Sequence, residues 1–209
     1  MHAACLKEPT EPRKVAAILT GGEGERVQIR DNEKGYGLVS RWLHWLMALA
    51  IFFLFGLGYW MMGLEYYSPY YRSAPDLHRS IGIVVGLALV FRFVWRLANT
   101  KPDDSELSHV EQIAAKLVHW GFYPLILVIV ISGYLISSSD GRPIDVFGLI
   151  SIPSLVTEKG LSDQAGYLHK ILAYFVIGLA LVHAAASLKH HFWDRSGVLK
   201  RMISGPPED

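Results

Sequence analysis

The chain has 209 residues, a length that suits one compact domain. About half of the residues (51%) are apolar and only 19% are charged, a composition that is rare in a soluble domain of this size. The formal net charge of +1 gives no reason to expect a nucleic-acid partner or docking to an acidic surface. The single cysteine, Cys5, excludes an internal disulfide and a cysteine-ligated iron–sulfur site.

The N-terminal segment is polar, with a glycine-rich stretch at residues 21–24. It lacks the apolar core of a cleaved secretory signal, so we expect residues 1–36 to form a disordered cytoplasmic tail. Residues 37–203 are expected to form one transmembrane domain, and residues 204–209 a short C-terminal tail.

Four long apolar segments follow this tail. A run of about 18 or more such residues can cross a hydrocarbon core of about 30 Å as a helix. Buried helices of a soluble protein are the alternative, but four such runs within about 150 residues disfavour it. The sequence therefore predicts an all-α fold, an integral membrane four-helix bundle. Its spans lie at about residues 42–64, 79–98, 113–139 and 166–190.

The distribution of Lys and Arg predicts the orientation of these spans. Fifteen of the 20 basic residues fall on the side of the two termini, and five fall on the other side. Both termini are therefore expected in the cytoplasm. The connections 65–77 and 140–166 are expected on the outer side, which is the periplasm if the cell is a Gram-negative bacterium, with the longer one lying as a lid over the mouth of the bundle.

Histidines provide the candidate chemistry, because ionisable residues inside a membrane are costly and functional by default. His169 and His183 lie 14 residues apart, close to four helical turns, so both project from one face about 21 Å apart along the axis. This spacing is too long for one metal ion and suits two macrocycles at two depths. With one thiol in the chain, no C-x-x-C-H attachment exists, so any haem would be b-type.

The depth of each histidine in its segment selects its partner. His78, at the outer start of the second segment, matches His169 and predicts an outer haem. His44, at the inner start of the first segment, matches His183 and predicts an inner haem. Two neutral imidazoles per iron give a six-coordinate site that passes electrons and leaves no position for oxygen.

Further residues are candidates for contact with these groups. Gly82 and Gly86 follow His78 at i+4 and i+8, where they offer either a flat strip for a porphyrin or a helix-packing motif. Arg92 lies on the same stripe at the depth of the inner haem, where it either pairs with a propionate or snorkels to the interface. His119 stays open between iron ligand, propionate partner, quinone-binding residue and plain interfacial histidine.

Several motifs appear in order at matching depths, namely YGLVSRWLHW, APDLHRSIGI, VFRFVWRL, LVHWGFY, ISGYLISSSDGRPIDVFGL and VHAAASLKHHFWD. Over roughly residues 35–203 the chain thereby resembles the bacterial cytochrome b561 family, and most closely its homologues with the D-G-R-P loop. The resemblance implies an inner-membrane four-helix protein that holds two b haems and exchanges electrons with the quinone pool, ubiquinone included. It also implies that His44, His78, His169 and His183 are the iron ligands.

Four functions are compatible with these observations. The first is electron transfer between quinone and an unknown periplasmic donor or acceptor. Membrane lipid would surround the bundle in this case. Exposed glycine and aromatic faces would also permit a homodimer. The second is a superoxide:ubiquinone oxidoreductase, an activity of one family branch, although the outer connections mix both signs of charge. The third is the membrane anchor of a larger redox enzyme. A metal transporter is disfavoured, because the first, third and fourth spans lack carboxylates and thiols.

Overall fold

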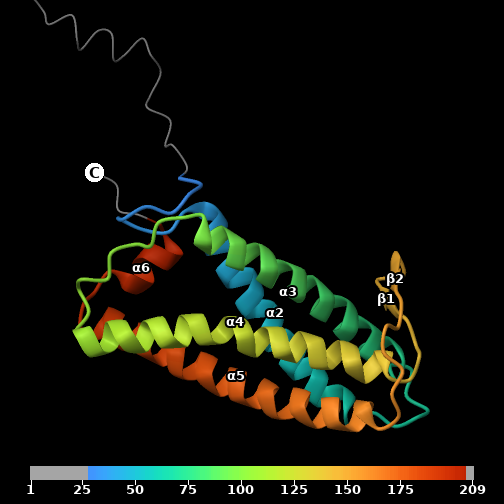
Figure 1. Ribbon diagram of the computed structural model, residues 1–209. Helices are drawn as coiled ribbons and strands as arrows, with labels where there is room; N and C mark the ends of the chain where they lie inside the picture. Colours follow the sequence, from blue (N-terminus) through green and yellow to red (C-terminus); the bar gives the residue numbers. More distant parts are fainter. Residues whose placement is uncertain (1–27, 206–209) are drawn as a thin grey trace, which may run out of the picture.

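The computed structural model describes residues 28–205 and is mainly helical (Figure 1). Each of its four long helices is long and apolar enough to cross a membrane, which confirms the predicted all-α membrane bundle. The helices are α2 (Leu38–Met61), α3 (Ser73–Leu97), α4 (His109–Ser138), α5 (Leu161–Phe192) and the short α6 (Val198–Ile203), and the strands are β1 (Ile144–Val146) and β2 (Ile150–Ile152).

The long helices pack in chain order, α2 on α3, α3 on α4 and α4 on α5. The start of α2 and the short helix α6 lie at the same end of the bundle (Figure 1). Two hydrogen bonds join them there, because Arg41 donates to the carbonyl of Ile203 at 3.0 Å and the indole of Trp45 donates to the carbonyl of Met202 at 3.1 Å. The two described ends of the chain therefore lie on one side of the membrane-spanning part.

The helices extend past the predicted apolar segments at most of their ends, because polar turns continue them beyond the apolar stretch. The start of α4 shows the cause, where Ser108 and Glu111 form a capping box that begins the helix four residues before the predicted span. Pro124 lies inside α4, which continues through it to Ser138. The length of an apolar segment predicts the part of a helix that can lie in the membrane. The capping residues determine where the helix begins.

The structure describes residues 28–36 of the predicted N-terminal tail, while residues 1–27 lie outside the described residues. The carboxylate of Asp31 accepts hydrogen bonds at 2.8 Å from the N–H of Gly37 and the hydroxyl of Ser40, and so ties the preceding segment to the first turn of α2. A Cβ atom at Gly37 would lie 2.3 Å from the carbonyl oxygen of Ile29, so glycine alone permits this close approach. Residues 28–36 are therefore folded against the bundle.

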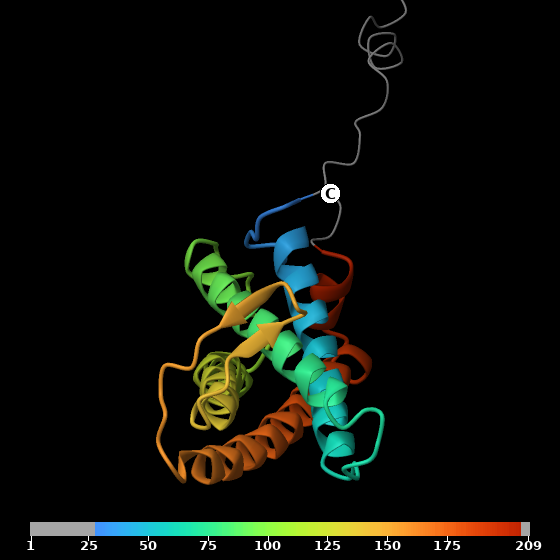
Figure 2. The same ribbon diagram turned by 90° about the vertical axis from the view of Figure 1, so that its right-hand side faces the viewer.

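The connection between α4 and α5 contains an antiparallel hairpin that pairs Ile144 with Ile152. Figure 2, viewed from the end that carries the hairpin, shows its strands in front of α3. Ile144 is buried, and the hydroxyl of Ser80 on α3 accepts a hydrogen bond from the N–H of Phe147 at 3.0 Å. The hairpin is thereby attached to α3 two residues from His78.

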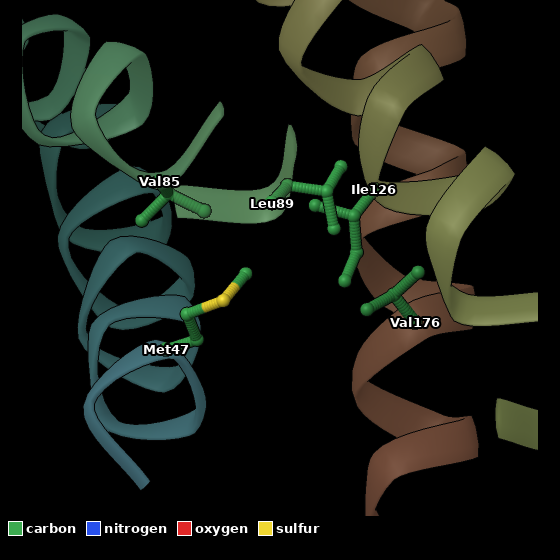
Figure 3. Close-up of a cluster of buried hydrophobic side chains, with 5 residues drawn as sticks. All are labelled: Met47, Val85, Leu89, Ile126 and Val176. Atoms are coloured by element: carbon green, nitrogen blue, oxygen red, sulfur yellow. The ribbon is translucent and has the colours of Figure 1, made fainter. Parts of the chain in front are cut away.

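The core is a small cluster in the middle of the bundle, made of Met47, Val85, Leu89, Ile126 and Val176 (Figure 3). All four long helices contribute to it. Because Val176 lies seven residues from both His169 and His183, the cluster separates two levels of histidine. In a lipid environment its contribution is close van der Waals packing rather than removal of apolar surface from water.

Candidate functional site

The structure brings the four predicted histidines together as two opposed pairs. The ring centres of His44 on α2 and His183 on α5 lie 6.3 Å apart, with an angle of 70° between the planes. The ring centres of His78 on α3 and His169 on α5 lie 6.1 Å apart, with an angle of 64°. These are the pairs that the depth argument predicts.

The distance between the ring centres of each pair can be compared with that of two imidazoles bound to one metal ion. A metal–nitrogen bond to imidazole is about 2.0–2.1 Å, so two imidazoles on opposite sides of one metal ion have ring centres about 6 Å apart. Both pairs match this value. Each pair could therefore hold one metal ion, such as a haem iron, between its two imidazoles.

His169 has a defined proton arrangement. Its Nδ1 lies 2.9 Å from the carbonyl oxygen of Ile129 and 3.3 Å from the hydroxyl oxygen of Ser132, both on α4. Because a carbonyl oxygen only accepts hydrogen bonds, Nδ1 carries the proton and Nε2 keeps its lone pair. This is the tautomer that a metal-binding histidine adopts, with a partner that fixes the orientation of the ring.

His78 is arranged in a similar way with a weaker contact. Its Nδ1 is buried and faces the main chain of α2 at Leu54, without a hydrogen bond of regular geometry. A buried ring nitrogen that lacks a full partner costs free energy. A metal bond at the second nitrogen would offset this cost and would hold His78 in this orientation.

His44 has a charged neighbour, because Nη2 of Arg92 lies 3.1 Å from Nδ1 of His44. A guanidinium only donates, so Nδ1 is the acceptor and the neutral ring carries its proton on Nε2. Metal binding through Nε2 therefore requires Arg92 to release Nδ1. The structure places Arg92 at the level of the His44–His183 pair, the depth predicted for it.

His119 also lies at this level, but its geometry differs. Its ring centre is 5.1 Å from that of His183, in an edge-to-face contact. This distance is too short for two imidazoles on opposite sides of one ion. Of the histidines near His183, His44 therefore has the separation expected of an opposing ligand.

The two predicted glycines have different surroundings. A Cβ atom at Gly82 would meet no atom within 4 Å, so α3 presents open space there. At Gly86 a Cβ atom would lie 2.9 Å from Cγ1 of Val130 on α4. Gly86 therefore lies at the close contact of α3 and α4, as the helix-packing alternative expects.

A polar cluster at the end that carries α6 has no counterpart among the predicted site residues. Lys189 bridges Glu111 at 2.9 Å and Asp194 at 2.8 Å, while Nδ1 of His190 lies 2.7 Å from Asp194. The hydrogen bonds from Lys189 and His190 lower the pKa of Asp194. The i,i+4 spacing of His190 and Asp194 was the available sequence signal, whereas the contact with α4 depends on tertiary packing.

Oxygen and nitrogen atoms of Glu111, His190 and Asp194 lie within 4.8 Å of one another, close enough to hold a metal ion. The ammonium of Lys189 already supplies a positive charge between both carboxylates. The cluster therefore acts as a network of ion pairs that joins the start of α4 to the end of α5.

Comparison with known proteins agrees with this architecture. Residues 35–205 match the family described as prokaryotic cytochrome b561. The chain is 42% identical over 176 residues to cytochrome b561 homolog 2 of Escherichia coli (strain K12), covering 83% of this chain and 94% of that protein. It is 29% identical over 176 residues to the probable superoxide oxidase CybB of Yersinia pestis, covering 81% and 96%. With these matches and its four membrane-spanning helices, the chain belongs to the prokaryotic cytochrome b561 family.

Proposed function

We propose that this protein transfers electrons across the bacterial inner membrane with two b-type haems, one held by His44 and His183 and the other by His78 and His169. Membership of the cytochrome b561 family supports membrane electron transfer and a b-type haem in general. The observation that carries the finer proposal is the pair of opposed ring contacts, at 6.3 and 6.1 Å. When bound, haem iron supplies reversible one-electron exchange.

Residues around the histidines fix the orientation of the rings, which favours electron transfer. Ile129 and Ser132 hold the Nδ1 side of His169, so the opposite nitrogen of the ring points away from α4. Rings held in this way need little rearrangement when the charge at a metal changes, which favours fast electron transfer. The packed cluster around Val176 lies between the two histidine levels.

The proposed partners follow from the position of the two levels. We propose quinone as the partner inside the membrane, and an unidentified donor or acceptor on the outer side. Family membership supports redox partners of this kind. Trp120 and His119 in the first half of α4 are the candidate quinone contacts, because both are exposed and the ring of His119 contacts that of His183.

The haem content of the purified protein tests the proposal. We expect a reduced-minus-oxidised spectrum with a b-type α-band and, by pyridine haemochrome, two haems per chain. One haem per chain would mean that one histidine pair is structural. A well-folded protein without haem would overturn the electron-transfer function.

We further propose that both termini face the cytoplasm. Fifteen of 20 basic residues lie on the side of the termini, and Figure 1 shows both described ends at the same end of the bundle. The single cysteine, Cys5, makes a direct test possible.

A membrane-impermeant maleimide is expected to leave Cys5 unlabelled in intact spheroplasts and to label it after the membrane is opened. The matched control is the double variant Cys5→Ala/Leu149→Cys. Leu149 is exposed in the hairpin at the opposite end, so its cysteine should react in intact spheroplasts. The reverse labelling pattern would invert the proposed orientation.

A second candidate is a superoxide:ubiquinone oxidoreductase, which the name of the Yersinia pestis relative favours. This activity would add a reaction at the outer side to the same histidine pairs. We expect purified protein, given superoxide and ubiquinone, to reduce the quinone faster than a sample without protein if this candidate is correct. Reduction at the background rate would leave the electron carrier as the function.

A further inference from the structure

Two glycines contact the histidine pair near the hairpin end, one from each flanking helix. A Cβ atom at Gly133 on α4 would lie 3.1 Å from Cε1 and 3.3 Å from Nδ1 of His169. A Cβ atom at Gly58 on α2 would lie 3.2 Å from Cε1 of His78. These distances are tighter than ordinary van der Waals contact, so any larger side chain would push against the imidazole.

Each of these glycines lies four residues after the residue whose main chain the histidine ring faces. His169 donates to the carbonyl of Ile129, four residues before Gly133. His78 faces the main chain at Leu54, four residues before Gly58. In a helix the Cα–Cβ bond points toward the N-terminus, so the side chain at i+4 lies over the carbonyl of residue i. A glycine at i+4 therefore opens that carbonyl to a ring from another helix.

We propose that Gly58 and Gly133 are positioning residues that admit the imidazoles of His78 and His169 to main-chain carbonyls of α2 and α4. By doing so Gly133 sets the tautomer of His169, and both glycines set the ring orientations and the 64° angle of this pair. The inference rests on the proposed function, in which this pair binds a haem. Among the glycines of the four long helices, these two are the ones whose Cβ atom would approach a histidine, and both approach the same pair.

The ring of His169 is held in place beside Gly133, so it cannot move freely away from a new side chain there. Ser132 and Ile129 hold the edge of the His169 ring. One turn earlier on α4, Val130 packs against Gly86 of α3, which fixes the distance between these helices. The ring and both of its hydrogen-bond partners meet on the side of α4 that carries Gly133, so a methyl group there must shift the ring relative to α4. Around Gly58 the ring of His78 lacks a regular hydrogen bond, so we expect a smaller response there.

The test uses the full-length protein with its haems and four alanine variants. Gly133→Ala and Gly58→Ala add a methyl group against a ring. Gly121→Ala on α4 and Gly56→Ala on α2 are matched controls, because their Cβ atoms would meet nothing within 4 Å. Alanine is the better helix former, so the controls should not weaken their helices.

Two measurements report on the ring geometry of one haem at a time. The largest g-value in the electron paramagnetic resonance spectrum follows the angle between the axial imidazole planes, and the midpoint potential follows the hydrogen bond at Nδ1. We expect Gly133→Ala to shift the g-value of one haem and raise its potential, or to lose that haem, leaving the other unchanged. Gly58→Ala should shift the g-value and the midpoint potential of the same haem by a smaller amount.

The outcomes separate this inference from the proposed function. If the wild-type protein holds two haems and both ring-facing variants have the spectra and potentials of the controls, the positioning role is wrong. If the controls shift the same haem equally, the effect is general helix packing and the inference also fails. If the wild-type protein does not hold two haems, the proposed function itself fails, whatever the variants show.

Discussion

Replacing His169 with alanine is expected to remove one haem of the two, and replacing His183 is expected to remove the other. Each variant should therefore show about half of the wild-type haem content per chain. The reason is that a b-type haem has no covalent link to the protein, so loss of one axial nitrogen leaves one iron bond and packing to retain it. Both histidines come from α5, so a helix that still folds can lose either haem independently.

Two other histidines provide matched controls for this experiment. His191→Ala alters an exposed residue near the end of α5 and should keep two haems. His119→Ala should also keep two haems, because the ring of His119 lies too close to His183 to be the opposing ligand. Loss of a haem in His119→Ala, with both retained in His44→Ala, would assign the opposing ligand to His119 instead.

Replacing Arg92 with glutamine is expected to lower the midpoint potential of the haem that we propose for His44 and His183, and to leave the potential of the other haem unchanged. A positive charge favours the reduced, less positive iron. The guanidinium lies 3.1 Å from Nδ1 of His44, and we expect it to stay near this ring after it releases Nδ1. A unit charge about 8 Å from a redox centre, at an effective dielectric constant of about 20, contributes about 2 kcal/mol. For a one-electron couple this corresponds to about 90 mV.

A potentiometric titration of the two α-bands measures this effect, and the second haem serves as an internal reference. Arg92→Lys retains the charge and should recover most of the potential. Unchanged potentials in Arg92→Gln would mean that Arg92 turns toward solvent in the haem-bound protein, which is the snorkelling alternative. A rise in potential would contradict the electrostatic argument.

The fold was largely predictable because the membrane limits what a chain can do. An apolar run long enough to cross the hydrocarbon core must be helical, since every backbone group has to be satisfied within the segment. Four runs therefore predicted four helices, and the structure has them. The helix ends were less accurate, because caps such as Ser108 with Glu111 lie outside the apolar stretch.

The pairing of histidines was predictable for a related reason. The helical period of 3.6 residues places His169 and His183 on one face, and alternating span direction sets the depth of His44 and His78. The structure brings the same pairs together. Their role as iron ligands stays a prediction that the alanine variants test.

Contacts between distant segments could not be predicted in this way. The hairpin on Ser80 and the close approach of Gly37 to Ile29 both depend on where two chain segments meet in space. Gly58 and Gly133 gave no distinct signal either, because the chain contains 19 glycines and several helical ones face open space.

The sequence by itself determined the four spans and the two depths at which histidines face one another, because bilayer thickness and helical period are the same in every membrane helix. Tertiary structure alone decided that the ring of His119 lies too close to His183 for an opposing ligand, and that Gly58 and Gly133 contact the rings of the other pair. These outcomes depend on helix rotation and separation to within about 1 Å, and close packing of side chains from several helices sets both.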